Sequence, residues 1–159
     1  MHVVNMRRKM TAMYQRLLKA PSSSFLLLGP RGTGKTTWLR KAFPGTQVFD
    51  LLDEGLYQSY LANAALFGRE LNTLKPSTWV IVDEIQRLPG LLNEVHRAME
   101  SRKLRFALTG SSARKLRRGG VNLLAGRAVR RLMFPLLPAE LSNDFDLERL
   151  GRRKQPSRW

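Results

Sequence analysis

Short apolar runs alternate with stretches of helical periodicity along most of this chain. Runs of consecutive apolar residues predict buried parallel strands, because a strand covered on both faces carries apolar side chains on both. We expect such strands at residues 25–28, 47–52, 79–82, 104–108 and 129–134. Between them, apolar residues recur at the spacing of amphipathic helices. The pattern therefore predicts an α/β fold, with a mostly parallel five-stranded sheet covered by helices on both faces.

Prolines and glycines mark the ends of the expected helices. A basic helix with an apolar stripe of methionine and leucine is expected over residues 1–20, where a proline and three serines end it. A later helix spans residues 54–74, and Gly68 is a candidate break within it. Pro89 opens the next helix. We expect an N-terminal basic helix packing on the core (1–20), one domain (21–150) and a disordered basic tail (151–159).

Composition excludes several classes of chemistry. The 159 residues suit one domain with a proper core, and the absence of cysteine excludes disulfides, thiol catalysis and cysteine-based metal sites. Two histidines are too few to form a metal cluster alone. No apolar run approaches the roughly 20 residues that span a bilayer, and no apolar segment follows the basic N-terminus as in a secretory signal. We therefore expect a cytoplasmic protein without a membrane partner.

Charge is distributed very unevenly. The chain has 28 Lys and Arg against 12 Asp and Glu, a formal net charge of +16. No acidic residue precedes Asp50, and none lies between Ser101 and Pro138. Such a balance favours polyanionic partners: nucleotide phosphates, nucleic acid or an acidic protein surface. Solvation of helix faces is the alternative explanation, so nucleic acid is one candidate partner among several.

A glycine-rich loop follows the first expected strand. Gly29 and, after four residues, Gly34-Lys35-Thr36 match the phosphate-loop pattern G-x-x-x-x-G-K-[ST]. Glycines let backbone N–H groups curl around a phosphate chain, Lys35 supplies charge for the β- and γ-phosphates, and the Thr36 hydroxyl can ligate Mg²⁺. An ordinary glycine-rich turn is the alternative, which the strand–loop–helix context disfavours. The residues expected to bind the nucleotide are Gly29, Pro30, Arg31, Gly32, Thr33, Gly34, Lys35, Thr36 and Thr37.

Two carboxylates follow the third expected strand directly. A carboxylate at this end of a buried strand can hold the magnesium shell of a bound nucleotide, and Asp83 has that position. Glu84 is placed to polarise an attacking water, so we expect it to be catalytic together with Lys35. The start of a helix is the alternative reading of this pair. The sequence between Thr36 and Asp83 is long enough to permit an extra strand between the phosphate-loop strand and the Asp83 strand.

Polar and basic residues after the fourth strand complete the candidate site. Ligands of open α/β sheets collect at the carboxyl ends of the strands, where Thr109 and Ser111 could sense the γ-phosphate or orient the water. Helix capping near Ser111 is an equally good reading and is compatible with the first. Arg127 and Arg114 are candidate arginine fingers acting on a neighbouring copy in a homo-oligomer. For any single arginine, a solvated surface charge is the simpler interpretation.

Together, these elements resemble a family of predicted prokaryotic ATPases within the AAA+ superfamily of P-loop NTPases. The similar segments are Leu28-Gly-Pro-Arg-Gly-Thr-Gly-Lys-Thr-Thr37, Val82-Asp-Glu-Ile-Gln-Arg-Leu-Pro89, Leu108-Thr-Gly-Ser-Ser-Ala-Arg-Lys-Leu116, Leu124-Ala-Gly-Arg127 and Phe134-Pro-Leu-Leu-Pro-Ala-Glu-Leu141. The resemblance implies that Gly29 to Thr37 bind ATP, that Asp83 and Glu84 are the Walker-B pair, and that Thr109 to Ser111 take the sensor-one position. Arg127 matches a Gly-Arg element of unassigned role.

The resemblance implies Mg²⁺-dependent ATP hydrolysis. Two alternatives stay open at this point: a nucleotide-dependent switch with little turnover, and a nucleic-acid-binding module. Members of the family continue into a helical lid and a C-terminal domain, whereas the composition here changes after Leu150. We therefore expect a truncated form whose catalysis is weaker than its nucleotide binding.

Overall fold

The computed structural model describes residues 14–111, 116, 124 and 126–141. Its contacts divide the chain into two compact units, Lys19–Pro135 and a second unit formed by the two ends of the chain. Of this second unit, residues 14–18 and 136–141 are described. The expected tail (151–159) and the first part of the expected N-terminal helix lie outside the described residues.

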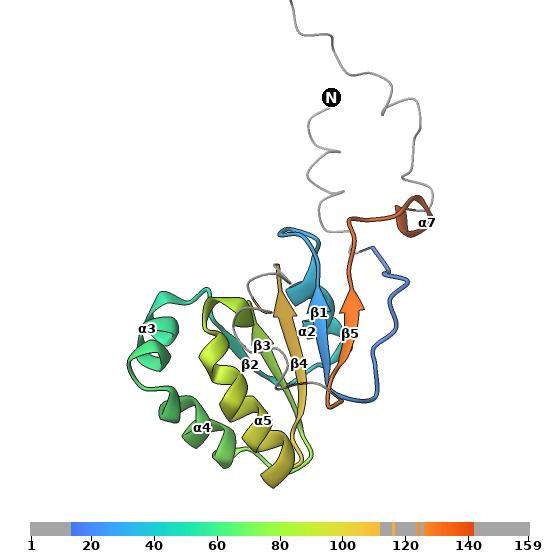
Figure 1. The fold of residues 1–159 in the computed structure, drawn as a ribbon. Helices are drawn as coiled ribbons and strands as arrows, with labels where there is room; N and C mark the ends of the chain where they lie inside the picture. Colours follow the sequence, from blue (N-terminus) through green and yellow to red (C-terminus); the bar gives the residue numbers. More distant parts are fainter. Residues whose placement is uncertain (1–13, 112–115, 117–123, 125, 142–159) are drawn as a thin grey trace, which may run out of the picture. The chain divides into compact units, whose positions relative to one another are not determined.

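A parallel five-stranded sheet forms the centre of the larger unit and confirms the expected fold (Figure 1). Its order is β2-β3-β4-β1-β5. The strands are β1 (Phe25–Leu28), β2 (Gln47–Asp50), β3 (Trp79–Asp83), β4 (Arg105–Gly110) and β5 (Val129–Leu132). An extra strand does lie between the phosphate-loop strand β1 and the Asp83 strand β3, and it is β4. The carboxyl ends of β1, β3 and β4 therefore meet at one edge of the sheet.

Alternate side chains of the central strands fill two layers. Leu26, Val80 and Phe106 belong to the main core, which also contains residues of the helices that follow β2 and β3. Phe25 faces the other side, where its ring lies 6.3 Å from that of Trp38 and 5.9 Å from that of Trp79. This alternation is the period of a pleated strand with both faces covered. It explains why β1 and most of β3 are uninterrupted apolar runs.

The helices mostly follow the expected pattern. They are α2 (Lys35–Ala42), α3 (Glu54–Ala62), α4 (Ala64–Thr73), α5 (Leu92–Ser101) and the short α7 (Pro138–Leu141), with 3₁₀ turns η1 (Ile85–Arg87) and η2 (Pro89–Leu91). Pro89 thus opens a 3₁₀ turn that leads into α5. In the described part of the chain, no helix has the length and apolar character needed to cross a membrane.

The break in the 54–74 helix falls at Asn63, so the expectation of a break at Gly68 is wrong. Asn63 is extended (φ −151°, ψ 91°), and its side chain accepts a hydrogen bond from the Ala65 N–H at 3.1 Å. An asparagine at this position caps the new helix, which a mid-helix glycine cannot do.

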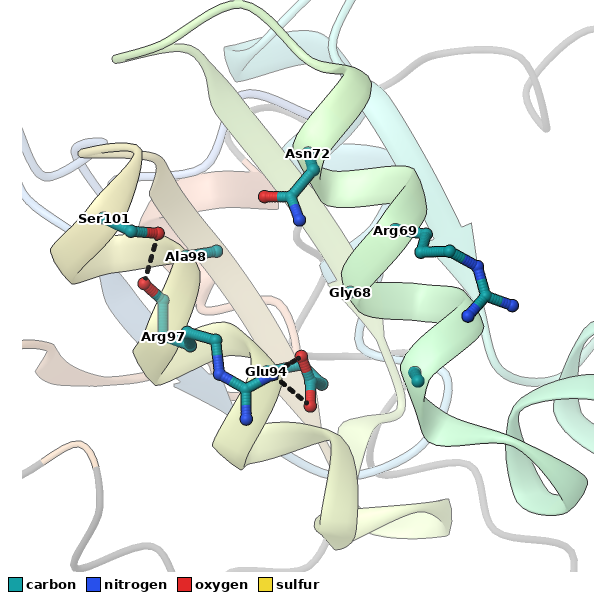
Figure 2. Close-up of a pocket in the computed structure, with 8 residues that line it drawn as sticks. Gly68, Arg69, Asn72, Glu94, Arg97, Ala98 and Ser101 are labelled. Atoms are coloured by element: carbon teal, nitrogen blue, oxygen red, sulfur yellow. Dashed lines mark hydrogen bonds and ion pairs between the residues drawn. The ribbon is translucent and has the colours of Figure 1, made fainter.

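Gly68 has a packing role instead (Figure 2). A Cβ at this position would lie 2.4 Å from Oε2 of Glu94 on α5. Glu94 in turn accepts a hydrogen bond from Arg97 at 2.9 Å. Gly68, with small neighbours such as Ala98, borders a hollow of about 180 Å³ between α4 and α5 that contains none of the expected site residues.

The expected helix over residues 1–20 is wrong for its described part, because residues 14–20 are not helical. The Leu17 N–H donates to Glu140 at 2.9 Å, and Arg16 forms an ion pair with the same carboxylate at 2.9 Å. These long-range contacts take the place of helical ones. Burial alone would raise the pKa of Glu140, but the N–H groups of Leu137 and Leu17 and the Arg16 guanidinium hold it below its usual value.

Candidate functional site

The phosphate loop between β1 and α2 depends on two glycines with left-handed backbone. Gly32 has φ of +80° and Gly34 has φ of +84°. A Cβ at either position would meet nothing within 4 Å, so backbone conformation, and not crowding, requires glycine there. Gly34 also stands at the start of α2, where no side chain caps the helix and no acidic residue lies in the first turn. The first N–H groups of α2 therefore face the loop without a side-chain acceptor at the cap.

The first glycine of the motif, Gly29, is required for a different reason. A Cβ there would lie 2.1 Å from the backbone oxygen of Met133, just after β5. Met133 N–H donates to Leu28 at 2.7 Å, and Gly29 N–H donates to Gly110 at 3.2 Å. Gly29 is thus enclosed between the ends of β4 and β5. These contacts fix where the loop leaves the sheet.

Lys35 lies inside the loop that it follows. The residue is only 5% exposed, and Nζ donates to the carbonyls of Gly29 at 2.8 Å and Pro30 at 2.9 Å. The Thr33 hydroxyl donates to the same Pro30 carbonyl at 2.9 Å. The carbonyls of the loop therefore surround the ammonium group of Lys35. Because, among the described residues, only neutral carbonyls hold this ammonium group, it is available to a phosphate that enters the loop.

Asp83 joins three elements at the end of β3. It is 2% exposed, and its two carboxylate oxygens each accept a hydrogen bond from a hydroxyl. One hydroxyl is that of Thr36, at the start of α2, and the other is that of Thr109, on β4. A buried carboxylate is stable only when its oxygens are paired, and these two threonines supply the pairing. The structure therefore brings the expected metal ligands Thr36 and Asp83 into direct contact.

Glu84 has an unusual backbone conformation. Its φ is +56° and its ψ +43°, a left-handed geometry that costs a non-glycine residue on the order of 1 kcal/mol. Its N–H donates to the Thr109 hydroxyl at 2.9 Å. Oε2 of its carboxylate accepts hydrogen bonds from the Ser111 hydroxyl, at 3.1 Å, and from the Gln86 amide. Thr109 and Ser111 therefore contact the Asp83–Glu84 pair directly, as expected for residues that share its edge of the sheet.

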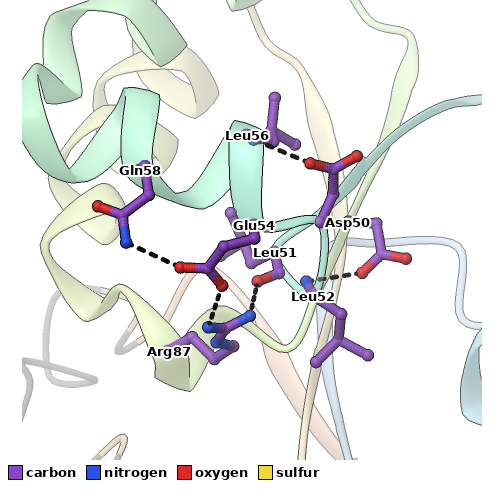
Figure 3. A network of polar contacts seen from close by, with 8 residues as sticks. Asp50, Leu51, Leu52, Glu54, Leu56, Gln58 and Arg87 are labelled. Atoms are coloured by element: carbon purple, nitrogen blue, oxygen red, sulfur yellow. Dashed lines mark hydrogen bonds and ion pairs between the residues drawn. The ribbon is translucent and has the colours of Figure 1, made fainter.

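Arg87 anchors the turn that follows Glu84 to the neighbouring helix α3 (Figure 3). Its guanidinium donates to the Leu51 carbonyl at 2.6 Å and to Glu54 at 3.1 Å, and lies 4.3 Å from the ring centre of Tyr57. The hydrogen bond from Gln58 and the contact with Arg87 hold the pKa of Glu54 below its usual value. This network ties η1 to the start of α3 and limits the movement of the segment carrying Glu84.

Not every expected site residue lies at this edge. Arg127 comes two residues before β5, which begins opposite Phe25 at the amino end of β1. There it forms an ion pair with Glu100 at 2.7 Å. Arg127 is therefore at the opposite edge of the sheet from the phosphate loop of its own chain. Arg114 lies outside the described residues.

Sequence reasoning missed Gln86 and Arg87. Both lie in η1, directly after Glu84, and neither belongs to the phosphate loop or to the carboxylate pair. Gln86 is only 9% exposed, which is unusual for an amide side chain. The sequence signal that could have identified Gln86 is its position as a polar residue between the apolar residues Ile85 and Leu88.

Taken together, the parallel sheet with β4 inserted, the phosphate loop and the buried carboxylate define a P-loop NTPase fold. A family model described as "AAA domain" matches residues 22–142, most of the chain. The chain belongs to this AAA-domain family, whose common property is nucleotide-binding, ATPase-like function.

Several solved structures are similar to the chain, including the following two. One is Caenorhabditis elegans PCH-2, with 16% identity, a TM-score of 0.48 and coverage of 72% of this chain and 36% of that one. The other is domain III of the Thermotoga maritima replication initiation protein DnaA, with 14% identity, a TM-score of 0.34 and coverage of 81% and 59%. The chain thus spans less than two thirds of either. No curated protein matches it.

Proposed function

We propose that this chain binds ATP with Mg²⁺ and hydrolyses the β–γ phosphoanhydride bond at the carboxyl edge of β1, β3 and β4. The observation that supports this most strongly is the contact between Thr36 and Asp83, which are 47 residues apart. It joins the phosphate loop to the strand that Glu84 directly follows. A glycine-rich turn with only a structural role would not need a buried carboxylate beside it.

The residues at this edge fit a magnesium ion and a triphosphate. Hydroxyl and carboxylate oxygens are the hard donors that Mg²⁺ prefers, and Thr36 and Asp83 supply them side by side. When bound, Mg²⁺ would neutralise charge on the β- and γ-phosphates. The N–H groups from Gly32 to the first turn of α2 would hold phosphate oxygens. Lys35 would exchange its two loop carbonyls for phosphate oxygens.

Glu84 would act on the attacking water. Its carboxylate accepts a hydrogen bond from the water and withdraws the proton as the water oxygen attacks the γ-phosphorus. The bond from the γ-phosphorus to the bridging oxygen breaks, and ADP leaves with that oxygen. Thr109, which contacts both Asp83 and the Glu84 N–H, is the proposed sensor at this edge, together with Ser111.

Two other functions follow from particular observations. The carboxylate of Glu84 is already hydrogen-bonded to Gln86 and Ser111, which favours a nucleotide-dependent switch if these contacts hold it away from the water. The net charge of +16 favours a nucleic-acid-binding role.

Arg127, at the far edge from its own phosphate loop, could act as an arginine finger only on a neighbouring copy in a homo-oligomer. A cytoplasmic location stays a prediction.

Nucleotide binding tests the phosphate-loop part of this proposal. Lys35→Ala should weaken ATP affinity on the order of 10- to 100-fold, because hydrogen bonds to charged groups are lost. Lys41→Ala is the matched control, since Lys41 is an exposed lysine of the same helix. Equal affinity of the two variants would contradict the assignment of the loop.

Binding to single-stranded and duplex DNA across a salt series tests the nucleic-acid alternative. A phosphate-contact surface loses affinity steeply with salt. No binding at low salt would remove this alternative and leave the ATPase proposal in place.

A further inference from the structure

Gln86 forms a closed triangle of hydrogen bonds with Glu84 and Ser111. Its Nε2 donates to Oε2 of Glu84 and, at 3.0 Å, to Oγ of Ser111. Ser111 in turn donates its single hydroxyl proton to the same Oε2 at 3.1 Å. The protons are fully used: two from the amide and one from the hydroxyl. The three side chains come from the end of β3, from η1 and from the residue after β4.

The other end of the Gln86 amide shows that this orientation has a cost. Oε1 is buried and has no hydrogen-bond partner in the part of the chain that the structure describes. It lies against Gly110, where a Cβ would come within 2.9 Å of it, and that Cβ would also lie 2.9 Å from Leu116. Reversing the amide would place Oε1 against the Glu84 carboxylate and leave the NH₂ group in apolar surroundings. Glu84 therefore fixes the orientation of the amide.

A role in packing alone does not account for this arrangement. A leucine has a similar volume and would fill the same space without leaving a buried acceptor unpaired. The unpaired Oε1 makes the amide less favourable for stability than an apolar side chain at this position. The only gain from the amide is the hydrogen bonding of its NH₂ group, which holds one oxygen of Glu84.

We propose that Gln86 is a positioning residue for Glu84. Gln86 and Ser111 both engage Oε2, while no described residue forms a hydrogen bond with Oε1. The Glu84 backbone is fixed by Thr109, and its side chain is partly exposed. One oxygen is thus held against the end of β4, and the other faces the solvent side, where it can accept the proton of the attacking water. This inference rests on the proposed ATPase function.

The first test separates chemistry from binding. Gln86→Leu is expected to lower kcat for ATP hydrolysis at least 10-fold, because a misplaced catalytic group slows chemistry, while the Kd for ATP changes less than twofold. Gln47→Leu is the matched control. Gln47 is an exposed glutamine at the amino end of β2, away from the carboxyl edge that holds the site. It should leave both kcat and Kd unchanged. Wild-type kcat in Gln86→Leu would overturn the inference.

The second test does not depend on turnover. The side-chain amide of Gln86, observed by ¹⁵N NMR, should exchange its protons much more slowly than that of Gln47. Its resonances should move in Glu84→Ala and in Ser111→Ala and stay in place in Gln47→Leu. Fast exchange with no response to Glu84→Ala would overturn the inference whatever the turnover. An amide coupled to Glu84 in a wild-type protein without turnover would instead show that the ATPase proposal is wrong and that the contact is a static one.

Discussion

The phosphate loop and the end of β3 are the two halves of one site, yet they are built differently. The loop consists of backbone: left-handed glycines, helix N–H groups, and carbonyls that Lys35 reaches five and six residues back. The end of β3 consists of side chains, and its contacts join residues 25 to 47 apart. The loop is therefore specified locally. The side-chain contacts at the end of β3 form only because the sheet places β4 between β3 and β1.

This difference predicts what damages each half. The folded loop, which is made of backbone, should keep its stability when single side-chain groups are removed, but should lose stability when atoms are added where the chain is enclosed. The end of β3 should lose stability when a single hydroxyl or amide is removed, because each of these groups has a separate partner. Substitutions that add or remove single groups can therefore break or sharpen the comparison.

Adding one carbon at Gly29 should have the largest effect. Gly29→Ala places a Cβ 2.1 Å from a backbone oxygen of Met133, which cannot move without separating β5 from β1. We expect a loss of about 3 kcal/mol in the free energy of unfolding, measured by urea denaturation. Gly90→Ala is the control, because a Cβ there meets nothing within 4 Å. Equal stability of the two variants would show that Gly29 is not enclosed as described.

Removing one hydroxyl at Thr109 should have an intermediate effect. Thr109→Val keeps the shape but leaves one Asp83 oxygen and the Glu84 N–H without a partner at a buried position. The expected loss is about 1–3 kcal/mol in the free energy of unfolding. Asp83→Asn combined with Thr109→Val should lose less than the sum of the single changes, because the two groups share one interaction. Strict additivity would contradict a direct contact.

Acid should weaken the attachment of η1 to α3 slightly, through protonation of Glu54. Its folded pKa is lowered, so its contribution to stability is present above the usual value of 4.5 and is lost as pH falls through the folded pKa. Below pH 4.5 the Arg87 anchor of η1 should loosen in the wild type. In Glu54→Gln this pH dependence should be absent, and the variant should already show at pH 7 the looser anchor that the wild type shows in acid. Hydrogen exchange of the η1 amides between pH 3 and 7 measures it; identical profiles for the two proteins would rule out this anchor.

The same contrast explains how much could be predicted from the sequence. The strands, the phosphate loop and the Asp83–Glu84 pair lie in continuous segments whose pattern is local, and their positions could be read directly. Gln86 and Arg87 escaped prediction because their partners, Ser111 and Leu51, lie on elements that only the sheet order brings near. Their roles are tertiary.

Two errors in the helices have the same origin. Gly68 was expected to break a helix because glycine is a weak helix former, but its missing Cβ makes room for Glu94 on α5. Residues 14–20 were expected to be helical from their apolar spacing, but Arg16 and Leu17 instead form hydrogen bonds with Glu140, more than 120 residues away. In both places a long-range contact overrides a local preference.

The most direct test of the central claim is steady-state phosphate release by the wild type and Glu84→Gln at saturating ATP and Mg²⁺, with the Kd for ATP measured for both. Loss of a general base typically lowers the rate on the order of 100-fold or more, and the substitution leaves the phosphate loop intact. We predict a fall of that size with a Kd changed less than threefold. Equal rates in the two proteins, with ATP bound equally well, would contradict the claim that this edge of the sheet is a hydrolytic site.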